Sequence, residues 1–303
     1  MIAIWLGDLA LGISYGAMVI GVYLTFKLLD IPDLTIDGSY ALGGAVTALF
    51  AVNHLNPLYS MLCVLLFGML AGAVTGLLAT KVKINAILSG VLVSIALYTI
   101  NIRIMGQPNL PFFNSTTMFT MFTDMGLSRE LAALILFGCV TLLIAFLAVF
   151  FLQSEFGLTL RTVGENRAMA TAQGIDSDAY IIFGLALSNG LIALSGSLLA
   201  QYQGFSDVNM GIGMILIGIA SFIIGESLLR PSTIIWCVTA SIIGGIIYRL
   251  IVTTAIYINI DPADMKLATA LIVIAAFAIP RWKEMGGLFS HFRNKHAALE
   301  EGE

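Results

Sequence analysis

The stretch Glu155–Asp178, EFGLTLRTVGENRAMATAQGIDSD, is a polar segment inside a very apolar 303-residue chain. Residues 131–152 before it and residues 179–206 after it contain no Asp, Glu, Lys or Arg. Each of these flanking runs is long enough to cross a bilayer, which takes about 20 mostly apolar residues. The order of apolar run, polar segment and apolar run therefore predicts two membrane-spanning helices joined by a folded segment outside the membrane.

The polar segment carries helix signals of its own. Thr162 and Glu165 fit a capping box at a helix start, and Gly174 suits a left-handed residue at a helix end. We therefore expect one short helix over 162–174, pressed against something outside the membrane. Its small residues, Ala170 among them, are expected to face a partner that leaves them little room.

The rest of the chain repeats the apolar pattern. Hydrophobic residues make up 59% of the sequence and charged residues 11%, against about 25% charged residues in soluble domains. The composition predicts an all-α, polytopic transmembrane helical bundle with about nine spans, in a range of eight to ten. We place the spans at 9–26, 38–53, 58–80, 84–105, 131–153, 179–204, 212–229, 232–257 and 265–280.

These spans form a single integral membrane domain, residues 1–285, in which 154–178 is the cytoplasmic segment. Residues 286–303 are expected to be a partly disordered cytoplasmic tail, whose basic and aromatic residues favour the inner membrane surface over nucleic acid. No basic region precedes the first apolar run, so we expect that run to remain in the protein rather than to be removed as a signal peptide.

Lysine and arginine predict the orientation, because they accumulate on the cytoplasmic side of a membrane protein. With nine spans the two termini lie on opposite sides. A cytoplasmic C-terminus and an outside N-terminus place ten of the 14 basic residues inside and four outside. The segment 154–178 is then cytoplasmic, and the loop 106–128 is external.

Several function classes find no support in the sequence. Cys63, Cys139 and Cys237 each lie inside an expected span, and the three His do not cluster, so no metal site and no enzyme is predicted. No Gly-Lys dipeptide occurs, which excludes the phosphate-binding loop of P-loop ATPases. If ATP drives this protein, then ATP and Mg²⁺ bind to a separate ATPase subunit.

Three runs of residues carry a resemblance to a known family. They are residues 161–175, RTVGENRAMATAQGI; the Gly-rich residues 211–227 with the span before them; and residues 29–40, LDIPDLTIDGSY. Over roughly residues 5–285 the chain resembles ABC importer permeases of the branched-chain amino acid and ribose type, closest to a subgroup described as putative tryptophan/tyrosine or uncharacterised permeases.

The resemblance implies a permease subunit of vitamin B12-importer-like (type II) architecture. It implies a second copy of the chain as a homodimer partner, an ABC ATPase beneath, an extracytoplasmic substrate-binding protein outside, and a small polar solute such as an amino acid, possibly aromatic, as substrate. In such permeases a short cytoplasmic helix sits in a cleft of the ATPase. By position, the residues that would couple to the ATPase are Thr162, Glu165, Asn166, Arg167, Met169, Ala170 and Gly174.

The interior of the spans contains uncharged polar residues that are candidates for a substrate pathway, although each could equally hydrogen-bond between helices. They are Ser39, Tyr40, Tyr98, Asn101, Ser188, Asn189, Tyr202 and Gln203. Gly68, Gly72 and Gly76 share one helix face, which favours packing within the subunit over a subunit interface. Glu226 is expected to pair with Arg230, one turn further along the chain.

Asp30, Asp33 and Asp37 leave an alternative function open. Three carboxylates at the edge of a span are typical of a cation site in an ion-coupled secondary transporter. The interpretation that we favour is that the Asp-Gly-Ser-Tyr turn starts a helix, with Asp37 as its N-terminal cap.

Overall fold

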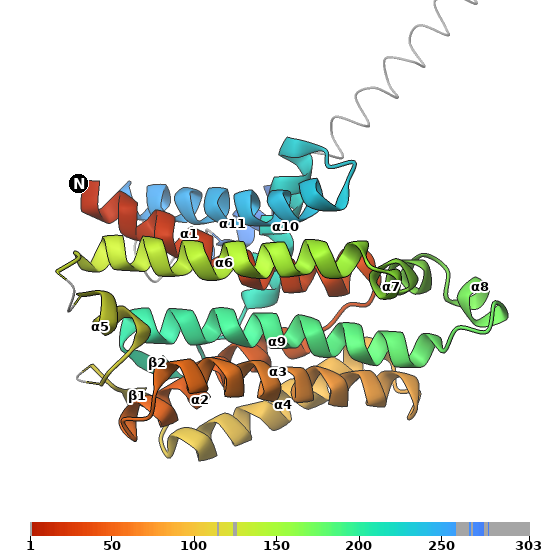
Figure 1. The fold of residues 1–303 in the computed structure, drawn as a ribbon, viewed down its shortest axis with the longest axis horizontal. Helices are drawn as coiled ribbons and strands as arrows, with labels where there is room; N and C mark the ends of the chain where they lie inside the picture. The colour runs from red at the N-terminus through yellow and green to blue at the C-terminus, as the bar shows by residue number, and fades with distance from the viewer. Residues whose placement is uncertain are drawn as a thin grey trace, which may run out of the picture.

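The structure, a computed structural model, describes residues 2–113, 115–123, 126–258, 267, 269–275 and 278. In this part of the chain, seven helices are long and apolar enough to cross a membrane (Figure 1). They are α1 (Ile2–Val22) with the π-helical turn η1 (Tyr23–Leu28), α2 (Thr35–Val52), α3 (Pro57–Thr80), α4 (Ala86–Met105), α6 (Arg129–Gln153), α9 (Ser177–Gln203) and α11 (Ile234–Tyr257).

A shorter apolar helix, α10 (Met214–Leu229), precedes α11. These eight helices coincide with the first eight expected spans. The ninth expected span, 265–280, lies mostly outside the described residues, and the expected tail, 286–303, lies wholly outside them. The expected loop 106–128 contains the strand β1 (Asn109–Pro111) and the helix α5 (Met118–Thr123), and β1 pairs antiparallel with β2 (Phe205–Asp207).

The helices form two groups that repeat one arrangement. In the first group, α1 packs antiparallel to α11, with Gly12 against Ile246 and Gly16 against Ile242, and α1 runs beside α10. In the second group, α9 packs antiparallel to α3 and runs parallel to α2. The hydrogen bonds from Ser39 to Asn189, 2.6 Å, and between Thr47 and Ser197, 2.6 Å, set the direction of α2 along α9.

The two groups run in opposite directions. Ser188 Oγ on α9 donates to the Gly21 carbonyl of α1 at 2.7 Å, and Ser195 Oγ donates to the Ser14 carbonyl at 2.9 Å. Residue numbers therefore rise along α9 as they fall along α1, so α1, α10 and α11 are an inverted counterpart of α9, α2 and α3. Figure 1 shows the first group above the second, with α6 between them in the view. Inverted repeats of this kind are common in transporters.

Glycine allows the helix backbones to touch. A Cβ added at Gly72 would overlap the Leu185 carbonyl, and one added at Gly196 would overlap the Tyr40 carbonyl. Gly68 and Gly76 also face α9, so the expected role of this glycine face in packing within the subunit is confirmed. Small residues bring membrane helices close enough for dispersion contacts to hold them, because lipid provides no hydrophobic force between helices.

The two groups meet where two helices begin inside the protein. Asp33 Oδ1 accepts the backbone N–H of Thr35 at 2.8 Å, and Asp33 Oδ2 accepts from Asn189 Nδ2, well inside α9, at 2.6 Å. Asp37 lies in the first turn of α2, and its carboxylate accepts the N–H groups of Gly213 at 2.9 Å and Ile215 at 3.0 Å, at the start of α10. The prediction that Asp37 caps its own helix is therefore wrong, because α2 begins earlier and Asp37 caps α10 instead.

Two further pairs of charged residues join helices of the bundle. Glu226 accepts from Lys27 at 2.7 Å, so the expected pair with Arg230 is not formed. Arg230 ends α10 in a left-handed conformation, φ 45°, and its backbone N–H, rather than its side chain, bonds to Glu226, at the carbonyl and 2.9 Å away. Arg249 on α11 pairs with Asp8 on α1 at 2.9 Å, which adds an ionic contact to the packing of these two helices.

Substitutions at two glycines test the backbone packing. Gly72→Leu should lower the melting temperature of the detergent-purified protein sharply, because the side chain would meet the α9 backbone and overpacking costs about 1–3 kcal/mol or more. Gly138→Leu on α6 is the matched control, since a Cβ there would have no heavy atom within 4 Å. Leucine is also a better helix former than glycine by roughly 0.8 kcal/mol. Equal melting temperatures for the two variants would contradict the packing described here.

Candidate functional sites

The segment 154–178 lies at one end of the bundle, outside the long helices, and contains two short helices (Figure 1). They are α7 (Glu155–Glu165) and α8 (Arg167–Ala172). Ser154 Oγ caps α7 by accepting the N–H of Gly157 at 3.3 Å. Asn166 separates the two helices with an extended backbone, φ −153°, and its Oδ1 caps α8 by accepting the N–H of Met169 at 2.9 Å.

The expected single helix over 162–174 is therefore wrong, and so is its capping box. Thr162 lies in the last turn of α7, where its hydroxyl donates to the Leu158 carbonyl at 3.0 Å. The helix starts upstream because Gly157, Leu160 and Val163 bury one face of it. The expected left-handed residue at Gly174 is confirmed, with φ 85°.

The segment is fixed to the body of the protein by close packing. A Cβ added at Gly164 would overlap the Leu28 carbonyl, so α7 contacts the backbone where η1 ends. Ala170 is 0% exposed and clusters with Val163, Ile181 and Leu185. The expectation that Ala170 faces a partner is therefore wrong, because its small size serves the packing of α8 onto the chain's own helix α9.

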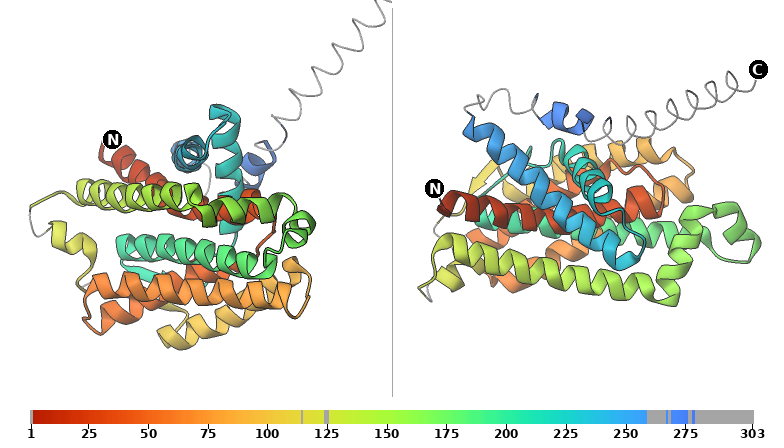
Figure 2. Two further views of the ribbon diagram at one scale, coloured as in Figure 1. Left: turned by 45° about the vertical axis from the view of Figure 1, so that its right-hand side comes forward. Right: turned by 90° about the horizontal axis from the view of Figure 1, so that it is seen from above.

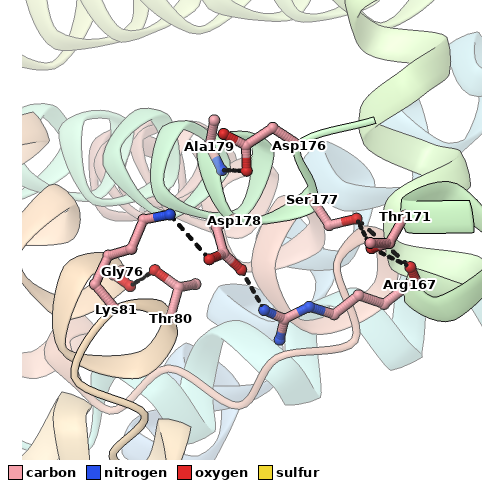
Figure 3. Close-up of polar contacts among 9 residues, drawn as sticks. All are labelled: Gly76, Thr80, Lys81, Arg167, Thr171, Asp176, Ser177, Asp178 and Ala179. Atoms are coloured by element: carbon pink, nitrogen blue, oxygen red, sulfur yellow. Dashed lines mark hydrogen bonds and ion pairs between the residues drawn. The ribbon is translucent and has the colours of Figure 1, made fainter. Parts of the chain in front are cut away.

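An ionic cluster also fixes α8, as Figure 3 shows. Asp178, in the first turn of α9, accepts from Arg167 of α8 and from Lys81, at the end of α3, the latter at 3.0 Å. The hydrogen bond and the negative charge of Asp178 raise the pKa of the Lys81 ammonium. The hydroxyls of Thr171 and Ser177 lie 2.9 Å apart beside this cluster. Sequence analysis identified Arg167 but missed Asp178 and Lys81, because the turn after α8 and the packing of α3 against α9 bring the three together.

The remaining expected coupling residues lie on the surface. Met169 is 52% exposed, and Glu165, Asn166 and Gly174 are exposed as well. Leu158 on α7 is a second exposed apolar side chain of the segment. The segment thus combines a rigid attachment with an outer surface of apolar and charged residues.

The structure divides the eight candidate pathway residues into separate places. Ser39 and Asn189 meet Asp33 in the interior, and Ser188 bonds to α1, so these three hold helices together. Tyr40 is fully buried in the core. Tyr202 and Gln203 lie at the far end of α9, away from 154–178, where Tyr202 stacks against Phe119 and Phe137.

Tyr98 and Asn101 are brought together at a cavity of about 350 Å³ between α2, α4 and the segment that leads into α10. Its lining also includes Asp37, which sequence analysis assigned to a helix cap or a cation site rather than to the pathway. The Asp37-Gly38 pair was the sequence signal that Asp37 lies near a helix start. The residues whose N–H groups bond to it, Gly213 and Ile215, follow more than 170 residues later.

Asp30, Asp33 and Asp37 do not gather into a cation site. Asp33 is buried against Thr35 and Asn189, Asp37 faces α10, and Asp30 is exposed. Among the described residues, no group of three or more His, Cys, Asp or Glu side chains is placed to hold a metal ion.

Comparison with known proteins identifies the family. The sequence profile described as "Branched-chain amino acid transport system / permease component" matches residues 5–278. The chain belongs to this family of ABC transporter permeases. Its members are transport permease components and not enzymes. The protein is a membrane permease with several apolar helices.

Individual relatives agree with this assignment. The chain is 43% identical over 261 residues to the tyrosine transport system permease protein of Clostridioides difficile (strain R20291), covering 86% of each chain. It is 30% identical over 268 residues to an uncharacterised protein of Rickettsia prowazekii (strain Madrid E), covering 86% of this permease and 92% of that protein. The expected resemblance to tyrosine-type permeases is thus confirmed.

A solved structure shares the fold. It is PsaBC from Streptococcus pneumoniae in complex with Fab, which matches with a TM-score of 0.52 over 90% of this permease and 89% of that chain, at 14% sequence identity. At this identity the match concerns the fold alone.

A pair of tryptophan substitutions tests which face of α8 is buried against the protein. Ala170→Trp should lower the melting temperature of the permease and expose 154–178 to protease, because overpacking a buried site costs about 1–3 kcal/mol. Met169→Trp, one residue earlier on the exposed face, should leave both unchanged. Protease resistance in Ala170→Trp equal to that of Met169→Trp would show that α8 does not pack as described.

Proposed function

We propose that this permease is the transmembrane subunit of an ATP-binding cassette importer. It moves an amino acid or similar small polar solute, of aromatic type, across the cytoplasmic membrane by alternating access. The observation that carries the proposal is the segment 154–178, which is held to the bundle on one side and exposes apolar and charged residues on the other. The name of the 43% identical relative, a tyrosine transport system permease protein, supports the substrate class.

The energy for transport comes from a separate subunit in this proposal. The sequence has no phosphate-binding loop, so ATP and Mg²⁺ belong to the partner ATPase. Exposed apolar patches outside the membrane mark protein–protein contacts, and in this proposal the exposed Leu158 and Met169 belong to one such patch. They form the docking surface for the ATPase, together with Glu165 and Arg167.

The attachment of the segment explains how movement would reach the spans. The segment follows directly from α6, and the chain turns sharply at Ser154, where α7 begins (Figure 2). α7 presses on the end of η1 through Gly164, and Asp178 ties α8 to the ends of α3 and α9. A displacement of the docking surface is therefore transmitted to four spans at once, which favours rocking of the bundle over movement of one helix.

The proposed importer has two further protein partners. A second copy of the chain completes the transporter as a homodimer of vitamin B12-importer-like architecture, in the lipid bilayer. An extracytoplasmic substrate-binding protein docks at the end of the bundle that carries β1, β2 and α5. The alternative, an ion-coupled secondary transporter, is not favoured, because Asp33 and Asp37 have separate partners and Asp30 is exposed.

Charge distribution supports a cytoplasmic location for 154–178. Six basic residues of the described chain lie at this end of the bundle: Lys27, Lys81, Lys83, Arg161, Arg167 and Arg230. Three lie toward the other end: Arg103, Arg129 and Arg249. Cytoplasmic loops carry the excess of Lys and Arg, so the N-terminus is outside.

The docking surface is tested by charge substitution. Leu158→Asp and Met169→Asp should each weaken pull-down of the co-expressed ATPase by roughly tenfold, the equivalent of about 1.4 kcal/mol. The reason is that each puts an unpaired charge at the centre of an apolar contact. Leu55→Asp is the matched control, since Leu55 is an exposed leucine at the opposite end of the bundle. Unchanged ATPase binding in both test variants, with normal melting temperatures, would refute the docking surface.

The orientation is tested by cysteine labelling. Gln107 and Gln173 are exposed glutamines at opposite ends of the bundle. In a background without Cys63, Cys139 and Cys237, Gln107→Cys should react with a membrane-impermeant maleimide in intact cells. Gln173→Cys should react only after the membrane is permeabilised. The reverse pattern would invert the topology and place 154–178 beyond the reach of any ATPase.

A further inference from the structure

The interior of the permease contains one place where two helices start side by side. α2 starts at Thr35, level with the middle of α9, and α10 starts at Met214, next to Asp37. The segments that lead into them, 29–34 and 204–213, enter the bundle from opposite ends. Discontinuous helices at the junction of an inverted repeat are where transporters commonly bind their substrates.

A cavity lies at this junction. Its volume of about 350 Å³ is within the range of about 300–1,000 Å³ that is usual for small-molecule sites. Asp37, Gly38 and Ala41 of α2 line one wall, and α4 contributes Ser94, Ile95, Tyr98, Thr99 and Asn101 to another. Val208 and Ile212, from the segment before α10, complete it. Tyr98 is 46% exposed, so the cavity opens on the surface of α4.

Asn101 is a buried residue in the lining of this cavity, and one of its polar atoms lacks a partner among the described residues. Its side chain is 0% exposed, and its Nδ2 donates to the Gly38 carbonyl at 3.3 Å. Its Oδ1 has no hydrogen-bond partner in the described part of the chain. A buried acceptor without a partner costs about 1–3 kcal/mol. Because Oδ1 is fully covered, a ligand in the cavity reaches it only after the Asn101 side chain turns toward the cavity, and a hydrogen bond from the ligand would then recover that free energy.

The lining defines the chemistry of the ligand. Asp37 brings a carboxylate, two of whose acceptor positions are used by α10, and an ionised carboxylate offers about four. Among the residues that the structure describes, no Lys, Arg or His lines the cavity. The other walls are apolar or aromatic, from Ile95, Tyr98 and Ile212. The site therefore favours a small molecule with an ammonium group at one end and an aromatic or apolar group at the other.

We propose that this cavity is the substrate subsite of the permease, and this inference rests on the proposed import function. The ammonium group of an aromatic amino acid donates to Asn101 Oδ1 and to the Asp37 carboxylate. The aromatic side chain lies against Tyr98 and Ile212, and the carboxylate points to the open side of the cavity.

The test measures protection of a cysteine in the cavity. Ser94→Cys is made in a background without Cys63, Cys139 and Cys237, in the complete complex with its ATPase, and maleimide labelling is timed. Excess tyrosine should slow labelling by about tenfold. Tyramine, which keeps the ammonium group and the ring, should also protect. 3-(4-Hydroxyphenyl)propionate, which lacks the ammonium group, should not.

Substitution of Asn101 tests the assigned acceptor. Asn101→Leu has nearly the same shape and should abolish protection by tyrosine and tyramine, whereas Asn101→Asp keeps an acceptor and should retain it. Asn209→Leu is the matched control, because Asn209 is exposed and lies outside the cavity lining. Melting temperatures establish that each variant is folded.

The outcomes separate the subsite from the import function. Tyrosine uptake by the reconstituted complex without any protection of Ser94→Cys would overturn the subsite alone. Protection that persists in Asn101→Leu, or that the propionate provides equally well, would also overturn it. Failure of the permease to bind any ATPase is measured separately, by pull-down, and would overturn the import function.

Discussion

The hydrogen bonds from Gly213 and Ile215 to the Asp37 carboxylate are the contact on which the architecture of this permease depends. Lipid offers no hydrogen-bond partners, so a helix that starts inside a membrane protein must have its free N–H groups satisfied by other parts of the protein. α10 starts in this way, and α2 starts beside it with Asp33 at its N-terminus. The Asp37 contact therefore supports a break in the spans and also joins the two inverted groups of helices.

The backbone that leads to this contact also connects the segment 154–178 with the interior of the protein. α7 packs on the end of η1 through Gly164, and residues 29–34 lead from there to α2 and Asp37. The proposed docking surface and the cavity are thus connected by a single short stretch of backbone. The same stretch is fixed at Asp33 by Asn189, so it connects the two sites as a tethered segment rather than as a free loop.

The sequence was sufficient for most of the fold, because a span is a local property. Runs such as 131–152 predict their helices from length and composition alone, and helices α1 to α4, α6 and α9 to α11 follow them. The errors arose where partners are distant in sequence. Asp37 caps a helix that begins more than 170 residues later, and Glu226 pairs with Lys27 rather than with nearby Arg230.

The candidate sites show the same limit of local sequence signals. Thr162 and Glu165 fit a local capping motif, but the buried face of α7 makes the helix start upstream of Thr162, and nothing local marks Ala170 as buried.

The close contacts at glycine also determine which sequence changes the fold tolerates. Where a Cβ at Gly43, Gly196 or Gly211 would overlap a carbonyl of a neighbouring segment, no rotamer can relieve the clash, because the obstacle is backbone. Exposed positions on the spans, such as Leu142 and Phe146, meet no such obstacle within the chain, and in lipid any apolar residue of similar size serves there. Divergence among proteins that share this fold is thereby directed to the outer surface of the bundle, while the lines of contact between α2, α3 and α9 remain restricted to the smallest side chain.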